Sequence, residues 1–268
     1  MFSCRILADS LASNGSRLTT MEVTYPRAIH AEIMTHREFS KNAASSRAIP
    51  VNKMIERIEN DPFIPLHWGM NQSGMVAEKE IDFALQEKAK QIWLTARDNA
   101  LNSARELMDL GVHKQITNRL VEPFMWITII ISSTNWKHLF RLRCSTDAEP
   151  HFQKIAGMMR DNLNASTPAP KQEGEWHLPL IQEDELNLDI DLLVKLSTAR
   201  CARVSYLSHN GKRDLEKDIE LYNKLRESGH FSPFEHVARA MPSNMIEKSG
   251  NFRGWIQHRK DLANEHLV

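Results

Sequence analysis

The segment from Thr35 to Arg47 holds the densest set of side chains suited to bind an anion. Its sequence, T-H-R-E-F-S-K-N-A-A-S-S-R, combines one histidine, two arginines and a lysine with serine and asparagine. Hydroxyls, backbone amides and planar guanidinium groups are what a phosphate dianion needs. A solvated polar loop after a helix has a similar composition, so composition alone leaves a phosphate-binding loop and a plain surface loop equally open.

A second candidate is the segment W-K-H-L-F-R-L-R, which ends at Arg143. On a helix, the guanidinium of Arg143 would lie near Leu139 and Phe140. An arginine among apolar neighbours is costly unless an anion pairs with it, which points to an anionic ligand. An amphipathic surface helix explains the same pattern, and this segment alone favours that simpler interpretation.

The third candidate, H-F-S-P-F-E-H, runs from His230 to His236. Two histidines and a glutamate suggest metal ligands or an acid–base pair. The histidines are six positions apart with Pro233 between them, which matches no common zinc spacing, so we expect no metal site. A turn in which Ser232 caps a helix that Pro233 begins is the competing explanation.

Several elements must position these segments. Residues 17–26 are rich in β-branched types and predict a strand that Pro26 ends. The run Ile127–Ile131 lies within a predicted helix but also fits a strand. Apolar periodicity predicts helices over 28–36, 51–59, 77–110, 113–122, 124–142, 189–202 and 214–228. Breaks in periodicity predict loops over 40–47, 61–75 and 164–179. The fold class expected is α+β, a helix-rich single domain with a limited antiparallel sheet.

Composition and the absence of certain motifs argue against several classes of function. Lys+Arg and Asp+Glu both number 34 among 268 residues, which argues against a general nucleic-acid binder. Three scattered cysteines indicate neither disulfides nor a zinc site, and favour an intracellular protein. The longest apolar run, Phe124–Ile131, is too short to span a membrane, and the N-terminus does not resemble a signal peptide. The absence of G-x-G-x-x-G and G-x-S-x-G argues against a Rossmann cofactor site and a hydrolase elbow.

Taken together, the three segments resemble the flavin-dependent thymidylate synthases. That family carries the pattern R-H-R-x-x-S-x-N-x-x-S-x-R, which residues 35–47 match except that Thr35 replaces the first arginine. Phe140–Arg143 resembles the family element N-F-x-x-L-R, with His138 at the asparagine position. Ala202–Tyr206 and His230–His236 resemble A-R-V-S-F and H-x-T-P-F-E-H, and Arg119 matches R-x-x-x-P.

The order of these elements is rotated. In most members the A-R-V-S and P-F-E-H elements precede R-H-R, whereas here they follow it, as in a circular permutation. The resemblance covers about residues 17–160 and 190–242. It implies one domain over 1–268, similar to thymidylate synthase-complementing proteins, with a possible insertion at about 61–91. A true permutation would place the strand near Thr19–Tyr25 beside Val237–Met241.

The resemblance implies that the chain methylates dUMP to dTMP, with FAD as cofactor and methylenetetrahydrofolate and NADPH as co-substrates. It further implies a cytoplasmic homotetramer with shared active sites, without nucleic-acid or membrane partners. A non-catalytic nucleotide-binding or regulatory protein is the main alternative, against which Arg143 and His230 argue because phosphate binding needs neither. A serine hydrolase using Ser45 is a second alternative, but no Asp–His pair is placed for it.

The resemblance also assigns roles. Arg143 is the expected catalytic residue, since it would stabilise the ionised pyrimidine imide. Arg119 is expected to reach the same nucleotide from a neighbouring subunit. The residues expected to bind dUMP are Glu32, Ala43, Ala44, Ser45, Ser46, Arg47, Arg119 and Arg143. The residues expected to bind FAD are Thr35, His36, Arg37, Asn42, Ser132, Ser133, Thr134, His138, Ser205, His230 and Ser232. Family members often have glutamine at Glu32 and an acid at Ala43.

Overall fold

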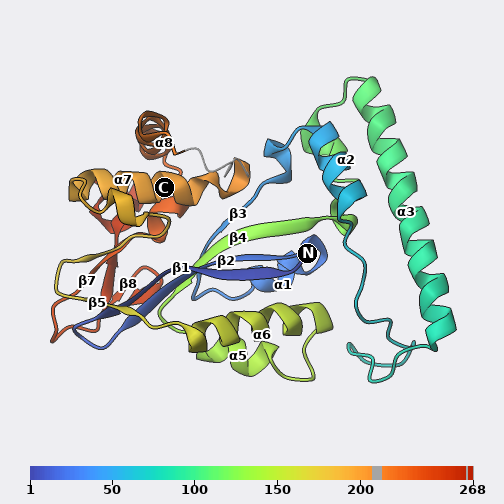
Figure 1. Cartoon of the computed structure of the whole chain (residues 1–268), viewed down its shortest axis with the longest axis horizontal. Coiled ribbons are helices and arrows are strands. Elements are labelled where there is room, and N and C mark those ends of the chain that lie inside the picture. The colour runs from blue at the N-terminus through green and yellow to red at the C-terminus, as the bar shows by residue number, and fades with distance from the viewer. Residues whose placement is uncertain (207–212, 264, 268) are drawn as a thin grey trace.

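A five-stranded sheet forms the centre of the molecule (Figure 1). The computed structural model describes residues 1–206, 213–263 and 265–267. The strands lie in the order β3-β4-β2-β1-β5, and only β1 and β5 pair in parallel. Their bounds are β1 (Ser3–Ala12), β2 (Arg17–Pro26), β3 (Ser40–Ala43), β4 (Trp126–Ser133) and β5 (Ala169–Lys171).

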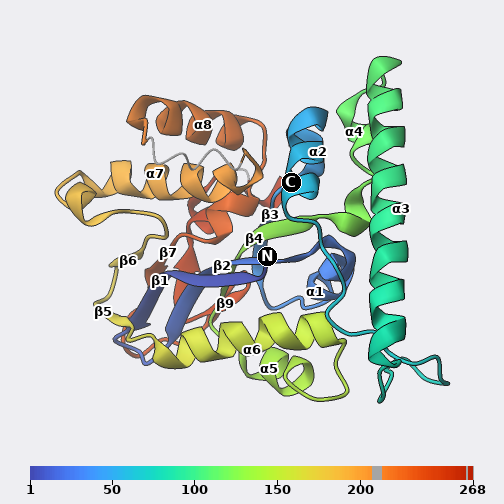
Figure 2. The ribbon, with the colours of Figure 1, turned by 45° about the vertical axis from the view of Figure 1, so that its right-hand side comes forward.

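Helices cover both faces of this sheet, and the views in Figures 1 and 2 agree on the layers. Helices α5 and α6 lie against one face, α7 and α8 lie over the other, and α2 and α3 stand at one end. The helices are α1 (His30–Met34), α2 (Val51–Asn60), α3 (Phe83–Asp109), α4 (Lys114–Thr117), α5 (Lys137–Arg143), α6 (Pro150–Ala165), α7 (Ile190–Ala202) and α8 (Leu215–Glu227). The expected α+β class is confirmed.

Alternation along β4 decides which side chains enter which layer. Ile127, Ile129 and Ile131 point into the core that α6 closes with Phe152. Ile130 points to the opposite face and packs under α7. Because both faces are covered, the strand is apolar on both sides in its middle, which is why its sequence also fits a buried helix.

The long helix α3 stands at the edge of the molecule (Figure 2). Only Leu101 and Ala104 of its 27 residues are buried. They pack with Met54 and Ile58 of α2 and with Phe124 in a separate core cluster. This cluster attaches α2 and α3 to the end of β4.

Small strands near the C-terminus join the sheet's far end. They are β6 (Trp176–His177), β7 (Ala238–Ala240) and β10 (Trp255–Gln257) in one sheet, and β8 (Lys248–Ser249) with β9 (Phe252–Arg253) in a hairpin. Leu18 at the start of β2 shares a buried cluster with Ala238 and Ala240. The expectation that the strand near Thr19 lies beside the segment near Met241 is therefore confirmed.

Several expected elements match the structure and others do not. The strand over 17–26 and the helices over 51–59, 189–202 and 214–228 are confirmed within two residues. The expected helix over 124–142 is wrong, because the chain forms β4 and then α5. The expected loop over 40–47 begins as β3, since Ser40–Ala43 pairs with Ile129–Ser132. The helix expected over 77–110 begins only at Phe83.

A chain of buried hydrogen bonds crosses the sheet beneath the C-terminal segments. The Thr20 hydroxyl lies 2.6 Å from the Ser132 hydroxyl and 2.8 Å from Nε2 of His177. His177 Nδ1 lies 2.8 Å from the Ser10 hydroxyl, and Ser132 lies 2.8 Å from Nδ1 of His236. All five residues are buried, and His236 Nε2 has no partner among the described residues.

These two histidines make the fold sensitive to acid. Burial lowers the pKa of both His177 and His236 to about 3. The unfolded chain protonates them near pH 6.5 and the folded chain only near pH 3, so stability falls as pH drops through this interval. We expect a loss of about 2 kcal/mol per histidine between pH 7 and pH 5, measured as the free energy of unfolding in urea.

The variant His177→Gln tests whether His177 causes this loss of stability in acid. Its stability at pH 7 should be lower, but its loss between pH 7 and pH 5 should be smaller than that of the parent by about 2 kcal/mol. An unchanged pH dependence in this variant would show that His177 does not carry the effect.

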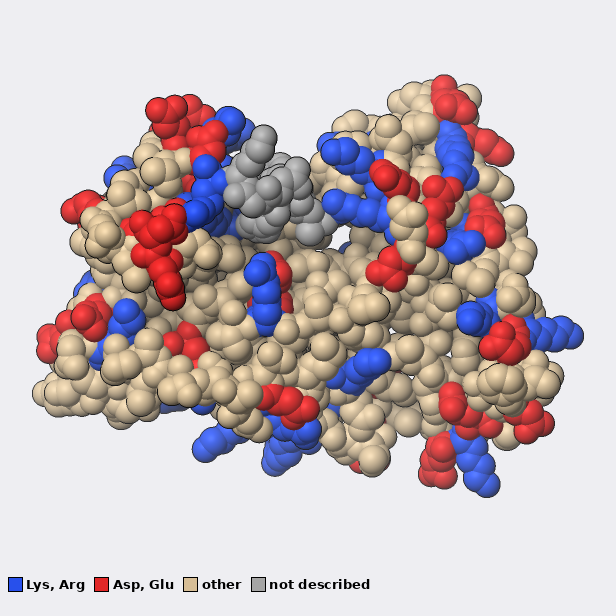
Figure 3. All heavy atoms as spheres, in the orientation of Figure 1, with Lys and Arg blue, Asp and Glu red and all other residues tan. Residues whose placement is uncertain are grey.

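No helix in the described part of the chain combines the length and hydropathy needed to cross a membrane. On the face shown in Figure 3, blue and red side chains are interspersed, in keeping with equal numbers of basic and acidic residues.

Candidate active site

Arg143, the last residue of α5, is held between three partners. Its Nε donates to Nε2 of His36 at 3.2 Å, and its Nη1 donates to Oε2 of Glu32 at 3.3 Å. Its guanidinium carbon lies 4.5 Å from the centre of the Phe152 ring. The side chain is 23% exposed, so the cation is partly desolvated and has one free edge.

His36 accepts this hydrogen bond because it is neutral. Burial lowers its pKa to about 4, and the positive charges of Arg143, Lys41 and His138 act in the same direction. At neutral pH the ring therefore offers a lone pair to Arg143. Its ring also packs edge-on against Phe152, which fixes it beside the arginine.

A pocket of ≈ 510 Å³ opens beside His36. It lies between the turn after α1 and the start of α5. Its lining residues are Thr35, His36, Arg37, Glu38, Phe39, Asn135, His138 and Leu139. This pocket thus brings together four of the residues expected to bind FAD, namely Thr35, His36, Arg37 and His138.

A second pocket, of ≈ 410 Å³, contains the predicted phosphate-binding loop. Arg119 lines it together with Ser45 and Arg47, all from one chain. The turn after α4 places Arg119 beside the loop of its own chain. That Arg119 reaches the nucleotide from a neighbouring subunit stays a prediction. Glu122 also lines this pocket and takes part in bonds to Ser46 and Arg27.

The two pockets share no lining residue. Arg143 does not line the pocket of Ser45, and Ser45 does not line the pocket of His36. The strand β3 connects them in sequence, because it runs from Ser40 to Ala43 between the two segments. Glu32 lies with Arg143 and not with the phosphate loop.

Other expected residues form a third group around β3. Asn42 is buried and donates to the Cys201 carbonyl at 2.6 Å. The Ser232 hydroxyl lies 3.5 Å from Oδ1 of Asn42 and 3.5 Å from Nε2 of His230. The elements that carry residues 42 and 230–232 are therefore in contact. The side chain of Ser205 lies outside the described residues.

Two serines expected to face FAD are buried instead. Ser132 and Ser133 are both 0% exposed. Ser132 bonds to Thr20 and His236, and the Ser133 hydroxyl accepts from the Asn135 amide. The third residue of this set, Thr134, is partly exposed, and its hydroxyl accepts from the backbone N–H of Arg253.

The A-R-V-S element has a structural role that its motif did not indicate. Arg203 donates to Asp218 of α8 at 2.6 Å, and Asp218 also accepts from Arg200. Arg200 further donates to both oxygens of Glu185. Because Arg200, Asp218 and Glu185 are all buried, this cluster fixes α7 to α8 beneath the P-F-E-H turn.

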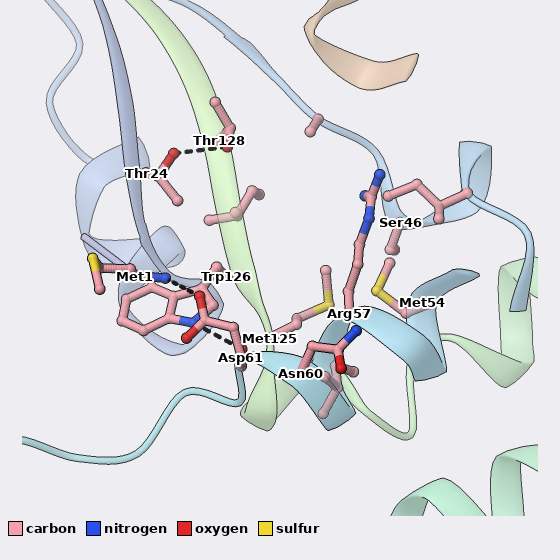
Figure 4. Close-up of a pocket in the computed structure, with 14 residues that line it drawn as sticks. Met1, Thr24, Ser46, Met54, Arg57, Asn60, Asp61, Met125, Trp126 and Thr128 are labelled. Carbon is pink, nitrogen blue, oxygen red and sulfur yellow. Dashed lines mark hydrogen bonds and ion pairs between the residues drawn. The ribbon is translucent and has the colours of Figure 1, made fainter. Parts of the chain in front are cut away.

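Sequence reasoning missed a third pocket, which Figure 4 shows. It measures ≈ 480 Å³ and shares Ala44 and Ser46 with the pocket of the phosphate loop. The Arg57 side chain extends from α2 toward Ser46, while the paired hydroxyls of Thr24 and Thr128 lie across the pocket (Figure 4). No spacing in the sequence links these residues, because they meet only through the packing of α2 against β4.

Among the residues that the structure describes, no group of three or more His, Cys, Asp or Glu side chains is arranged to hold a metal ion. The three cysteines are free, and burial raises the pKa of the thiol at Cys4, Cys144 and Cys201. None is an activated nucleophile.

Comparisons with known proteins identify the family of the chain. The family model described as "Thymidylate synthase complementing protein" matches residues 18–169, which is more than half of the chain. The matched region holds both pockets around β3 and ends before the A-R-V-S and P-F-E-H elements. No curated protein matches the chain.

Two solved structures of the UMP/dUMP methylase PolB from Streptomyces cacaoi are similar in fold. The one bound with 5-Br UMP is 12% identical with a TM-score of 0.50, and covers 61% of this chain and 89% of its own. The one bound with 5-Br dUMP is 11% identical with a TM-score of 0.49, and covers 61% and 90%.

Proposed function

Because the chain belongs to the family of thymidylate synthase complementing proteins, we propose that it methylates dUMP to dTMP with FAD as cofactor. Methylenetetrahydrofolate is the proposed carbon donor and NADPH the proposed reductant. The observation that carries this proposal is Arg143, a half-buried cation bonded to a neutral histidine beside a pocket. Such a cation favours an ionised ring over a neutral one.

The phosphate of dUMP is proposed to bind the loop Ala43–Arg47. Ser45, Arg47 and Arg119 line one pocket, and among the described residues neither guanidinium has an acidic partner. Two free arginines and a serine hydroxyl match a phosphate dianion. The nearby Glu122 would repel the phosphate but is already engaged by Ser46 and Arg27.

The residues around the His36 pocket fit FAD. His36 and His138 offer flat rings, while Arg37 and Asn135 offer donors at the rim. FAD held there and reduced by NADPH would supply the hydride that converts the transferred methylene into a methyl group. The protein's own part is to hold the pyrimidine as an anion through Arg143 and to keep His36 neutral, so that the anion has one cationic partner.

The separation of the two pockets supports a shared site. A nucleotide that binds Ser45 through its phosphate and Arg143 through its ring would have to reach from one pocket to the side of the other, and these two pockets share no lining residue. A second copy would supply the missing half, and we propose a homotetramer with sites built across its interfaces.

The flavin assignment gives a direct prediction. The purified protein should show flavin absorbance or acquire it on titration with FAD, and His138→Ala should retain less flavin than the parent. Arg141→Ala is the matched control, because Arg141 is an exposed residue of the same helix. A chain that leaves FAD free at saturation would contradict the flavin proposal, and retained dUMP binding would then favour the regulatory alternative.

A further inference from the structure

The hairpin of β8 and β9 lies against the loop that leads into the His36 pocket. The backbone N–H of Arg253 donates to the Thr134 hydroxyl at 3.1 Å. The next residue, Asn135, lines that pocket and donates to Glu38 at 3.0 Å. A segment more than a hundred residues away in sequence is thus brought to the rim of the proposed cofactor site.

This hairpin is fixed from several sides. Gly250, with φ +59, begins its two-residue turn, which requires this conformation. At the other end, Gly254 approaches so closely that a Cβ would lie 2.3 Å from the Ser16 hydroxyl. Asn14 donates to the Gly254 carbonyl at 2.9 Å. The backbone of Arg253 is therefore held in place before any ligand arrives.

The turn is also bonded to the motif strand β3. Asn251 donates to the Ser40 hydroxyl at 3.3 Å, and Gln257 donates to the same hydroxyl at 2.9 Å. Gln257 is 1% exposed and also donates to the carbonyl of Glu235. Asn251 thereby ties the hairpin to the R-H-R-x-x-S segment, and Gln257 of β10 ties that segment to the P-F-E-H turn.

The charges on the hairpin indicate an anionic ligand. Arg253 and Lys248 are direct cross-strand partners, so their side chains leave the same face. Like charges in this position are destabilising. Both residues are exposed, and neither has an acidic partner in the described part of the chain. An anion between them would relieve the repulsion.

We propose that Arg253, assisted by Lys248, binds the diphosphate of a dinucleotide or nucleoside diphosphate whose other end enters the His36 pocket. A guanidinium binds phosphate oxygens in pairs, and the diphosphate carries the charge that the two cations require. The assignment of this ligand as FAD rests on the proposed function. The diphosphate site itself rests on the hairpin.

The test compares ADP with adenosine, which lacks phosphate, by calorimetric titration. With dUMP held at saturation so that it occupies the phosphate loop, the wild-type chain should bind ADP about tenfold or more tightly than adenosine, as expected for charge-assisted hydrogen bonds. Arg253→Ala should abolish this preference and Arg253→Lys should keep part of it. Arg253→Ala leaves the backbone bond to Thr134 and removes the repulsion from Lys248, so the thermal midpoint should not fall.

Lys260→Ala is the control, because it removes a cation of the same C-terminal segment that Glu265 already neutralises at 2.7 Å. Its preference for ADP should equal that of the wild type. An equal preference in Arg253→Ala, or none in the wild type, would overturn the inference. A titration with FAD on the same samples tests the proposed function separately, since ADP binding through Arg253 does not depend on flavin binding.

Discussion

Arg143→Ala should slow single-turnover formation of dTMP at saturating dUMP by roughly 30- to 1000-fold. This range corresponds to about 2–4 kcal/mol, the loss expected for one charge-stabilising donor. The structure supports the size of the effect, because the Arg143 side chain is 23% exposed and its guanidinium lies over the Phe152 ring, so water does not replace it fully. Arg143→Lys should also be strongly impaired, since an ammonium group lacks the planar fork.

Two further measurements test whether Arg143 acts by activating the pyrimidine ring. Flavin binding and oxidation of the reduced flavin by oxygen should persist in both variants, because neither needs an activated pyrimidine. Removing Arg143 also removes a positive charge that lowers the pKa of His36, so that pKa should rise in Arg143→Ala. If pre-reduced Arg143→Ala forms dTMP as fast as the parent, the ring is activated by another cation, and Arg141 becomes the candidate.

Mixing the inactive variants Arg119→Ala and Arg143→Ala should restore activity if two subunits share each active site. Arg119→Ala removes a cation from the phosphate pocket, and Arg143→Ala removes the cation that is bonded to His36 beside the other pocket. In a mixed pair, one of the two sites receives both mutations and the other receives none. Random pairing of equal amounts should therefore recover about a quarter of the wild-type activity.

The structure supplies a sharp control for this experiment. Arg47 and Arg119 line the same pocket of one chain, so a mixture of Arg47→Ala and Arg119→Ala should stay inactive. Dissociation and reassociation must be verified by isolating mixed oligomers. Confirmed mixed oligomers of Arg119→Ala and Arg143→Ala without activity would show that both arginines serve a site within one chain.

The sequence by itself indicated the family and much of the local structure. The pattern from Thr35 to Arg47 predicted the loop that we propose as the phosphate site. The A-R-V-S and P-F-E-H elements, with the order in which they occur, predicted which distant segments meet. Helices such as α7 and α8 were predictable because apolar periodicity and the capping residues Asp189 and Asp214 agree on their limits.

Only the tertiary structure decided the remaining features. The run Ile127–Ile131 forms a strand because β2 and β3 pair with both of its edges, and periodicity does not record such partners. Ser132 lies inside the protein because Thr20 and His236 bond to its hydroxyl. The motif's phosphate loop lines one pocket, whereas Arg143 bonds to His36 beside another, because long-range packing fixes these positions. The same packing brings the backbone of Arg253 to Thr134. Sequence spacing indicates which face of a helix or strand a residue occupies. The residues that it contacts depend on the packing of segments far apart in the chain.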